Sequence, residues 1–172
     1  VREGKKLLLR ILKWGFIDKN PNTSIKDGLL NISGYTLSQF KRDFNRNERH
    51  KIENGLINEF DITLLYTLIH KLCRLVPPKS FIVVENSACK ELSKHLFSIK
   101  ETRNEFAHPN PNLSENEMKD KIGFVSNIFR DAIQEARVFF QVDSTEADNI
   151  INELSSILRD VVNSPLPATT IR

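Results

Sequence analysis

The sequence predicts an all-α fold, an antiparallel helical bundle with an N-terminal subregion of short helices. Three observations lead to this prediction. Apolar residues recur at the three- and four-residue spacing of helices along most of the chain. Residues typical of helix N-caps precede these segments, and loops containing Pro or Asn follow them. The one β-prone run, residues 81–84, cannot build a sheet alone.

The first third of the chain predicts three short helices. Residues 5–17 show an amphipathic pattern, and Pro21 in the following loop ends that helix. Residues 24–32 and 36–46 predict two further helices on either side of Gly34. These helices would form the N-terminal subregion of the domain.

A strongly apolar helix follows this subregion. Asp61 is its predicted N-cap, and the Pro77-Pro78 pair ends the run. Apolar residues recur around most of its circumference, which is typical of a central, buried helix. These residues are Leu64, Leu65, Leu68, Ile69, Leu72 and Leu75.

The second half of the chain predicts three longer helices. The first starts at residue 86 or 87 and ends before the loop at Pro109. Ser114 and Glu117 form a predicted capping box, which starts a long amphipathic helix to about residue 139. The last helix starts at residue 144 or 145. Short loops between them favour antiparallel packing.

A chain of 172 residues suits one domain, or one domain with a terminal appendage. We expect residues 1–60 to form the N-terminal helical subregion, residues 61–141 the core helices and residues 142–164 a C-terminal helix. Residues 165–172 have a linker-like composition. The sequence therefore suggests a domain from a longer protein that carries further domains.

Composition limits the classes of protein to which the chain can belong. A hydrophobic fraction of 40% and a charged fraction of 27% are ordinary for a globular protein in water. No apolar run approaches the roughly 20 residues of a membrane span, and we find no signal-peptide pattern. We expect an intracellular, cytoplasmic protein with no membrane partner.

The chain contains only two cysteines, Cys73 and Cys89, and neither belongs to a Cys-x-x-Cys pair. A metal site that combined them with His70 and His95 would need tighter local spacing than the sequence offers. We expect two reduced cysteines in the core, no bound metal and no cofactor.

The formal net charge is only +3, which by itself does not indicate nucleic-acid binding. Residues 37–51 nevertheless carry five basic residues against two acidic ones, a local +3. Such a cluster is either a solvated helix face or a surface that contacts phosphates, and it is a candidate path for RNA. The basic residues are Lys41, Arg42, Arg46, Arg49 and Lys51.

The segment Arg103-Asn104-Glu105-Phe106-Ala107-His108, directly before Pro109, carries the most information about function. Arg103 falls in the middle of an apolar stripe, where an arginine is costly unless its head group is paired or reaches water. One interpretation is that it reaches past the helix end and, with His108, complements the helix dipole. In the other, His108 turns toward Arg103 at the helix end and both line an active site.

The segment resembles the signature of HEPN domains, helical bundles of higher eukaryotes and prokaryotes, many of which are ribonucleases. That signature is an arginine, usually followed by a polar residue, and a histidine a few residues later at the end of one bundle helix. Arg103, Asn104 and His108 match each of these elements. Residues 7–136 can be aligned along such a domain.

The resemblance is closest to the animal branch found in DAZ-interacting zinc-finger-type ubiquitin ligases and in NACHT, death-fold and TIR-bearing immune-like proteins. Residues 60–66, Lys71-Leu72-Cys73 and Pro77-Pro78 are similar to that branch's central helix and its exit. Lys79-Ser80-Phe81 stand where the branch often has a Gly-Trp pair, and Phe106 stands where a tyrosine is common. Neither change removes a residue with an expected chemical role.

The resemblance implies a metal-independent endoribonuclease within a larger immune or stress-response protein. His108 would be the acid/base group, Arg103 would hold the phosphate, and Asn104 would orient the phosphate or the imidazole. Glu101 and Glu105 are isolated charges rather than a magnesium site. HEPN nucleases usually dimerise so that two motifs form one composite site, so we expect RNA and a second copy of the chain as partners.

Two other functions stay open at this point. The bundle could be a catalytically inactive HEPN-like dimerisation or adaptor module, in which Arg103 and His108 have structural roles. Alternatively, residues 24–32 and 36–46 could pair around Gly34 as a helix-turn-helix that binds DNA.

Overall fold

The structure is a computed structural model of the chain, and it describes residues 2–73, 87–107, 112 and 114–163. These residues form eight α-helices, one short π-helical turn and one short 3₁₀ turn, with no strand among them. The prediction of an all-α protein is therefore confirmed. None of the described helices is long and apolar enough to cross a lipid bilayer.

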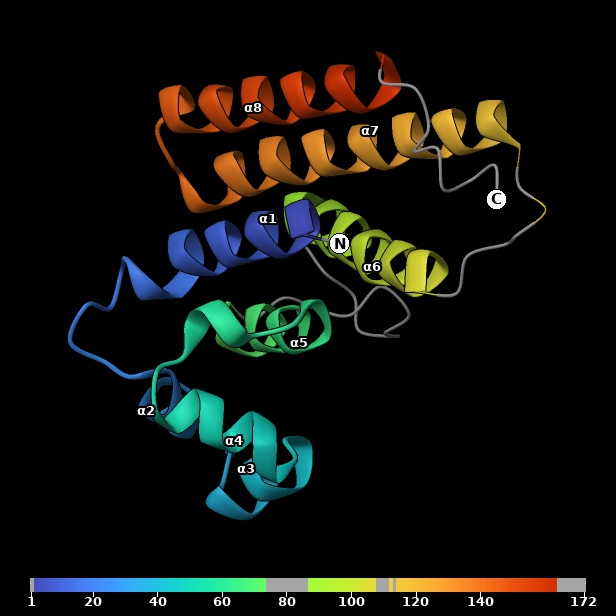
Figure 1. The fold of residues 1–172 in the computed structure, drawn as a ribbon. Helices are drawn as coiled ribbons and strands as arrows, with labels where there is room; N and C mark the ends of the chain where they lie inside the picture. The colour runs from blue at the N-terminus through green and yellow to red at the C-terminus, as the bar shows by residue number, and fades with distance from the viewer. Residues whose placement is uncertain (1, 74–86, 108–111, 113, 164–172) are drawn as a thin grey trace.

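Five helices make up the larger part of the fold (Figure 1). Helix α1 packs against α5, α6 and α7, while α6 and α7 pack along each other and α8 lies on the outer side of α7. The bounds are Arg2–Leu12 for α1, Ile62–Leu72 for α5, Ser87–Ala107 for α6, Glu115–Phe140 for α7 and Ser144–Asn163 for α8. The π-helical turn η1, Lys13–Ile17, continues α1.

The remaining short helices of the predicted N-terminal subregion lie on the side of α5 away from α7 and α8 (Figure 1), whereas α1, predicted in the same subregion, packs against α5, α6 and α7. Helix α2 contacts α3, α4 and α5, and so joins this subregion to the rest of the fold. The bounds are Ile25–Leu30 for α2, Leu37–Asp43 for α3, Arg46–Glu53 for α4 and Ile57–Glu59 for the 3₁₀ turn η2.

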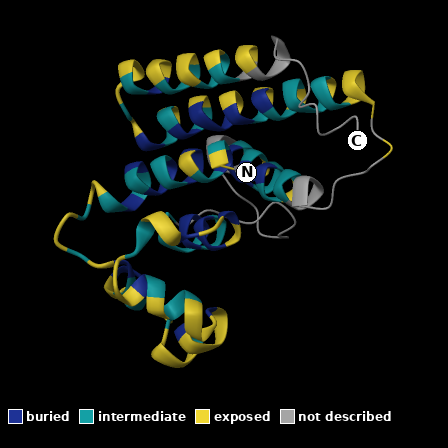
Figure 2. Ribbon diagram, in the orientation of Figure 1, coloured by how far each residue is buried: buried dark blue, intermediate teal, exposed yellow. Residues whose placement is uncertain are grey.

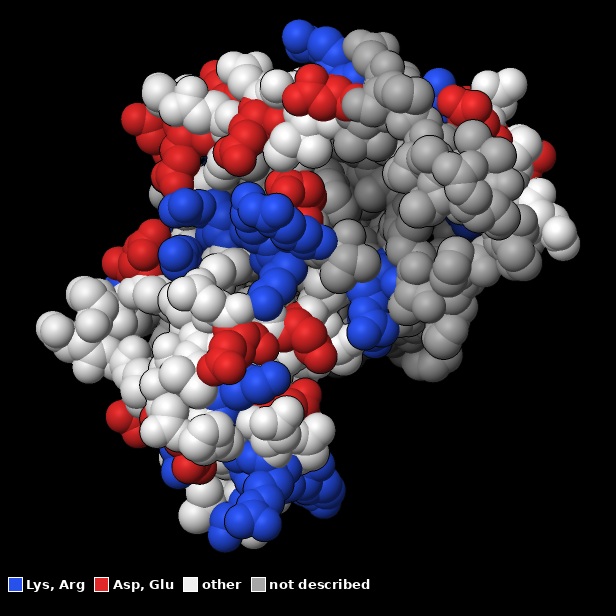
Figure 3. Space-filling model, viewed as in Figure 1, with Lys and Arg blue, Asp and Glu red and all other residues white. Residues whose placement is uncertain are grey.

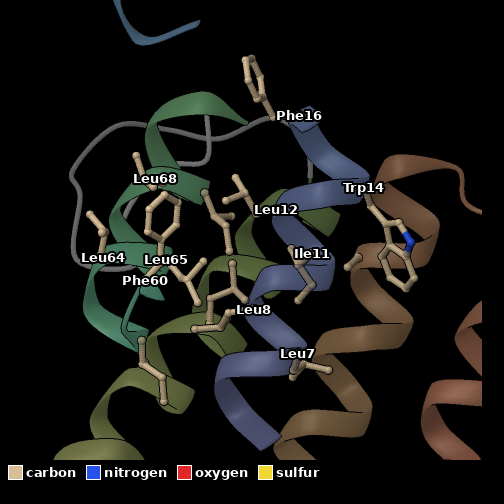
Figure 4. Packing of buried hydrophobic residues seen from close by; sticks show 14 of the residues in the cluster. Leu7, Leu8, Ile11, Leu12, Trp14, Phe16, Phe60, Leu64, Leu65 and Leu68 are labelled. Atoms are coloured by element: carbon tan, nitrogen blue, oxygen red, sulfur yellow. The ribbon is translucent and has the colours of Figure 1, made fainter. Parts of the chain in front are cut away.

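A single apolar core extends through both parts of the fold. Leu8, Ile11 and Leu12 on α1 are fully buried, and they lie next to the buried side chains of α5 (Figure 4). Trp14 points away from α5, toward the C-terminal helices. Phe44 of the N-terminal subregion is 1% exposed and belongs to the same core. Figure 2 shows that the buried residues follow the inner faces of the helices.

The predicted N-caps at Asp61 and Ser114 are confirmed, whereas the first helix begins at Arg2, three residues before its predicted start. The Asp61 carboxylate accepts a hydrogen bond from the backbone N–H of Leu64 at 2.8 Å. The Ser114 hydroxyl oxygen accepts one from the N–H of Glu117 at 3.2 Å, which is the Ser114 half of the predicted capping box. Each bond satisfies a donor that the first helical turn leaves unpaired.

The helix predicted at residues 36–46 was wrong at its C-terminal end. Helix α3 stops at Asp43, because Phe44 is extended and places its ring in the core. Asn45 then caps a new helix, α4, in a capping box with Glu48. Residues 81–84 and the Pro77-Pro78 pair lie outside the described residues.

Candidate functional site

Arg103 lies in the last turns of α6, as predicted, and its backbone is helical. Its side chain is half-buried and interacts with other groups of the protein. Ile99, one turn earlier on the same side of the helix, is 2% exposed. The structure therefore confirms that the apolar stripe of α6 continues up to Arg103. The side chain of Asn104 and all of His108 lie outside what the structure describes.

Three other helices meet α6 near this arginine. A methyl group placed on Gly4 of α1 would lie 3.2 Å from Phe129 of α7, 3.4 Å from Ile62 of α5 and 3.6 Å from Ile99 of α6. Ile99 and Arg103 are separated by one helical turn, a rise of about 6 Å. Arg103 is thus placed next to a junction of the starts of α1 and α5 with the middle of α7.

The face of α6 that packs on α5 carries a cluster that the sequence analysis missed. Tyr66 stacks on His70 with ring centroids 4.2 Å apart and meets Phe97 edge-on at 6.4 Å. The Lys100 ammonium lies 5.0 Å from the centroid of the Tyr66 ring. Position 104 continues this face, since it lies one turn after Lys100. The spacing of Phe97 and Lys100 was the available signal, but their partners come from another helix.

His70 is a buried histidine in this cluster, 8% exposed. Its Nδ1 lies 3.0 Å from the Tyr66 carbonyl oxygen, to which an Nδ1–H donates, and Nε2 is buried with no partner among the described residues. Burial lowers the pKa of His70, the hydrogen bond to Tyr66 opposes this, and Lys100 lowers the pKa further. These surroundings therefore favour the neutral form of the imidazole.

His95 is a second histidine on α6, and it faces α7. Its Nε2 lies 4.0 Å from the Asp131 carboxylate, while its Nδ1 is buried with no partner in the described part of the chain. His95 precedes Arg103 by about 12 Å along the helix axis and points to a different side. It is therefore not part of the Arg103 site.

The basic cluster predicted at residues 37–51 lies on α3 and α4, far from the end of α6 (Figures 1 and 3). Lys41, Arg42 and Arg46 are exposed. Arg49 instead donates to the carbonyl oxygens of Lys41 at 2.8 Å and Phe44 at 2.7 Å, which satisfies acceptors at the end of α3. Lys51 is half-buried. The structure does not bring this cluster and Arg103 together, and RNA binding there stays a prediction.

Two observations concern metal and thiol chemistry. Within the described ranges, no three or more His, Cys, Asp or Glu side chains lie close enough together to hold a metal ion. Burial raises the pKa of the Cys73 thiol to about 12, although Lys19 opposes this shift. Cys73 therefore stays a protonated thiol packed next to Gly15.

A scan against protein-family models, a search of the curated proteins and a search of the solved structures each found no match to the chain.

Proposed function

We propose that the chain is a metal-independent endoribonuclease domain of the HEPN type, with Arg103, Asn104 and His108 as its active-site residues. The observation that carries this proposal is the half-buried Arg103 in the apolar stripe of α6, one helical turn after buried Ile99. A guanidinium is always charged, so its partial burial in an apolar stripe carries a cost that a phosphate-binding role would account for. The sequence places His108 one residue beyond the end of α6.

The chemistry needs one base, one acid and one cation. His108 takes the proton from a ribose 2′-hydroxyl, and the 2′-oxygen attacks the adjacent phosphorus. The bond from phosphorus to the 5′-oxygen breaks, and an imidazolium protonates that leaving oxygen. The products are a 2′,3′-cyclic phosphate and a free 5′-hydroxyl. Arg103 stabilises the charge that develops on the phosphoryl oxygens, and Asn104 orients the phosphate or the imidazole.

A second copy of the chain would complete the site. One helix end supplies one histidine and one arginine, whereas the reaction uses a base and an acid at once. Two motifs facing each other across a twofold axis supply both. We therefore propose a homodimer or a higher homo-oligomer as the active form, with further domains of the same longer chain to bring the copies together.

The test is cleavage of labelled single-stranded RNA in excess EDTA by wild type, Arg103→Ala and His108→Ala. We expect wild type to leave 2′,3′-cyclic phosphate ends, and each variant to lose at least about 100-fold in rate. Arg130→Ala removes an exposed arginine of α7 and serves as the matched control. The assay is run on protein whose dimeric mass has been confirmed. Intact RNA with dimeric wild type, or equal cleavage by both variants, would overturn the proposal.

A second candidate function is a catalytically inactive module for self-association or adaptor contacts. It is favoured by two large apolar side chains on the outside of α7, Phe124 at 65% and Val138 at 57% exposure. This candidate predicts that Phe124→Ser abolishes dimerisation in mass measurements across concentration, while RNA stays intact with every variant. Detection of cyclic phosphate ends with wild type alone would exclude it.

A further inference from the structure

Helix α1 carries a row of basic side chains that the functional proposal does not use. Residues 2–13 contain five basic residues against one acidic residue, a local +4. Arg2, Lys6 and Arg10 of α1 and Lys13, the first residue of η1, follow one another at three- and four-residue spacing, so they lie within about 80° of one another around the helix axis. Successive members of this basic row are separated by roughly 4.5 to 6 Å along the axis.

The basic row faces away from the core. Leu7, Leu8, Ile11 and Leu12 fill the opposite side of α1 and are at most 2% exposed. Arg2 and Lys6 are exposed, and the Arg10 side chain is 42% exposed. Figure 3 shows Lys and Arg side chains gathered over α1 in the middle of this face of the molecule.

A groove of about 200 Å³ runs beside the basic row, between α1 and α8. Three cations of the row, Lys6, Arg10 and Lys13, line its α1 side. Ile150 and Leu154 of α8 give the other wall an apolar surface. The groove therefore places a line of positive charge along an apolar strip.

Acidic side chains near the groove form exposed ion pairs or, among the described residues, none. Arg10 meets Glu146 at 3.1 Å, and both side chains are more than 40% exposed. Lys6 meets Glu3 at 3.9 Å, while Glu153 lines the groove without an ion pair among the described residues. Exposed pairs of this kind contribute little, so a phosphate oxygen can replace either carboxylate.

The basic row leads toward the end of α6. Gly4, near the start of α1, packs beside Ile99, and Arg103 follows Ile99 by one helical turn. The row therefore starts at Lys13, at the end of α1 away from Ile99, and finishes at Arg2, at the end of α1 nearer to the Arg103 site. The exposed cations of α3 and α4 have no such position, because α5 lies between these two helices and α6 (Figure 1).

We propose that the outer face of α1 binds the sugar-phosphate backbone of single-stranded RNA. The phosphates lie along Arg2, Lys6, Arg10 and Lys13, and bases rest against the apolar wall of the groove. A regular row of cations matches the regular row of phosphates in such a strand. One part of this proposal rests on the proposed function, namely that the row delivers the strand to Arg103 for cleavage.

The test measures binding separately from cleavage. The probe is a fluorescent 2′-O-methyl oligouridine of about 12 nucleotides, which has no 2′-hydroxyl to react and fits the usual length of single-strand sites. Its affinity is measured against salt concentration for wild type and for a triple variant of α1, Lys6→Gln, Arg10→Gln and Lys13→Gln. We expect the slope of log affinity against log salt to fall by about 2, and the affinity at low salt to fall at least about tenfold.

The matched control carries the same loss of three charges on exposed residues of α6, α7 and α8 that do not line the groove: Lys94→Gln, Arg130→Gln and Arg159→Gln. We expect its salt slope to stay within about 0.5 of the wild-type value. A further variant, Glu146→Gln, removes the carboxylate that competes for Arg10, and we expect it to bind the probe more tightly. Circular dichroism confirms that each variant is folded.

The outcomes separate the binding surface from the nuclease. A smaller salt slope in the α1 variant supports RNA binding by the outer face of α1. If wild type nevertheless never cleaves ordinary RNA, only the proposed function fails. An unchanged salt slope in the α1 variant overturns the proposal that this face binds RNA, whether or not RNA is cleaved. The α1 variant is also tested for binding to vesicles that contain phosphatidylserine. If it keeps the wild-type salt slope for RNA but no longer binds these vesicles, the proposal is overturned, since α1 would then contact anionic lipid.

Discussion

Lys71 on α5 donates a hydrogen bond of 3.1 Å to Asp43 at the end of α3. The Tyr35 hydroxyl donates to the same carboxylate oxygen at 3.0 Å, and the Lys71 ammonium lies 5.2 Å from the centroid of the Tyr35 ring. The side chains of Tyr35 and Lys71 thus converge on one carboxylate oxygen of Asp43. They fasten the N-terminal subregion to the central helix.

The first prediction is that Asp43 makes the fold sensitive to acid. Burial raises the pKa of the carboxyl, but hydrogen bonds from Lys71 and Tyr35 together outweigh it and lower the pKa from 3.8. The contribution to stability is present above pH 3.8 and is lost as the pH falls through the lower pKa of the folded state. Urea unfolding from about pH 5 to about pH 2.5 should show less acid-induced loss for Asp43→Asn than for wild type. Asp148→Asn, an exposed control on α8, should unfold as wild type does.

The second prediction concerns His70, whose pKa the fold lowers from 6.5. Because the unfolded chain takes up this proton more readily, the free energy of unfolding falls as the pH drops below 6.5 and levels off below the folded pKa. His70→Gln should remove this decline in urea titrations, whereas His50→Gln, an exposed control on α4, should retain it. A decline of the same size in His70→Gln and wild type would show that another group causes it.

The third prediction compares two glycines that lie within helices. A Cβ at Gly28 would overlap the Phe16 ring and lie 3.2 Å from Leu72, whereas a Cβ at Gly123 meets nothing within 4 Å. Gly28→Ala should therefore destabilise the protein by about 1–3 kcal/mol. Gly123→Ala should stabilise it by about 0.5–1 kcal/mol, because alanine loses less chain entropy on folding. Urea unfolding measures both, and equal effects would contradict the packing at Gly28.

The fourth prediction separates structure from binding at the end of α3. Arg49→Ala removes the hydrogen bonds to the Lys41 and Phe44 carbonyl oxygens, so it should lower the free energy of unfolding by about 1–3 kcal/mol. Arg46→Ala removes an exposed arginine of α4 and should change the free energy of unfolding by less than about 0.5 kcal/mol. The affinity of folded Arg49→Ala for the 2′-O-methyl probe should equal that of wild type. A tenfold loss there would instead assign this arginine to RNA binding.

Local chemistry explains which parts of the fold were predictable from the sequence. The caps at Asp61 and Ser114 depend on residues only three positions away, so the sequence contains both partners of each bond. Helix α4 was missed because Ile52 is its only buried side chain, which leaves no apolar stripe. Its capping box, Asn45 with Glu48, was the signal that could have found it.

The candidate site was only partly predictable. The apolar spacing of α6 located Arg103 correctly, because Ile99 precedes it on the same side of one helix. The neighbours from α1, α5 and α7 depend on how helices cross, which spacing along one helix does not encode. The basic row of α1 was not predicted, because the apolar spacing of that helix indicates only its buried face. The local net charge of residues 37–51 also gave no indication that Arg49 donates to the carbonyl oxygens at the end of α3.

Helix α8 packs mainly on α7, and the exposed pair of Arg10 and Glu146 links it to α1. Such an outer helix can detach while the remaining core stays folded, so its amide protons should exchange with solvent well before those of α1 and α5. Detachment would also take away the apolar wall of the groove at Ile150 and Leu154. The same loosely held helix would then regulate access to the basic row, and RNA bound there should slow hydrogen exchange in α8.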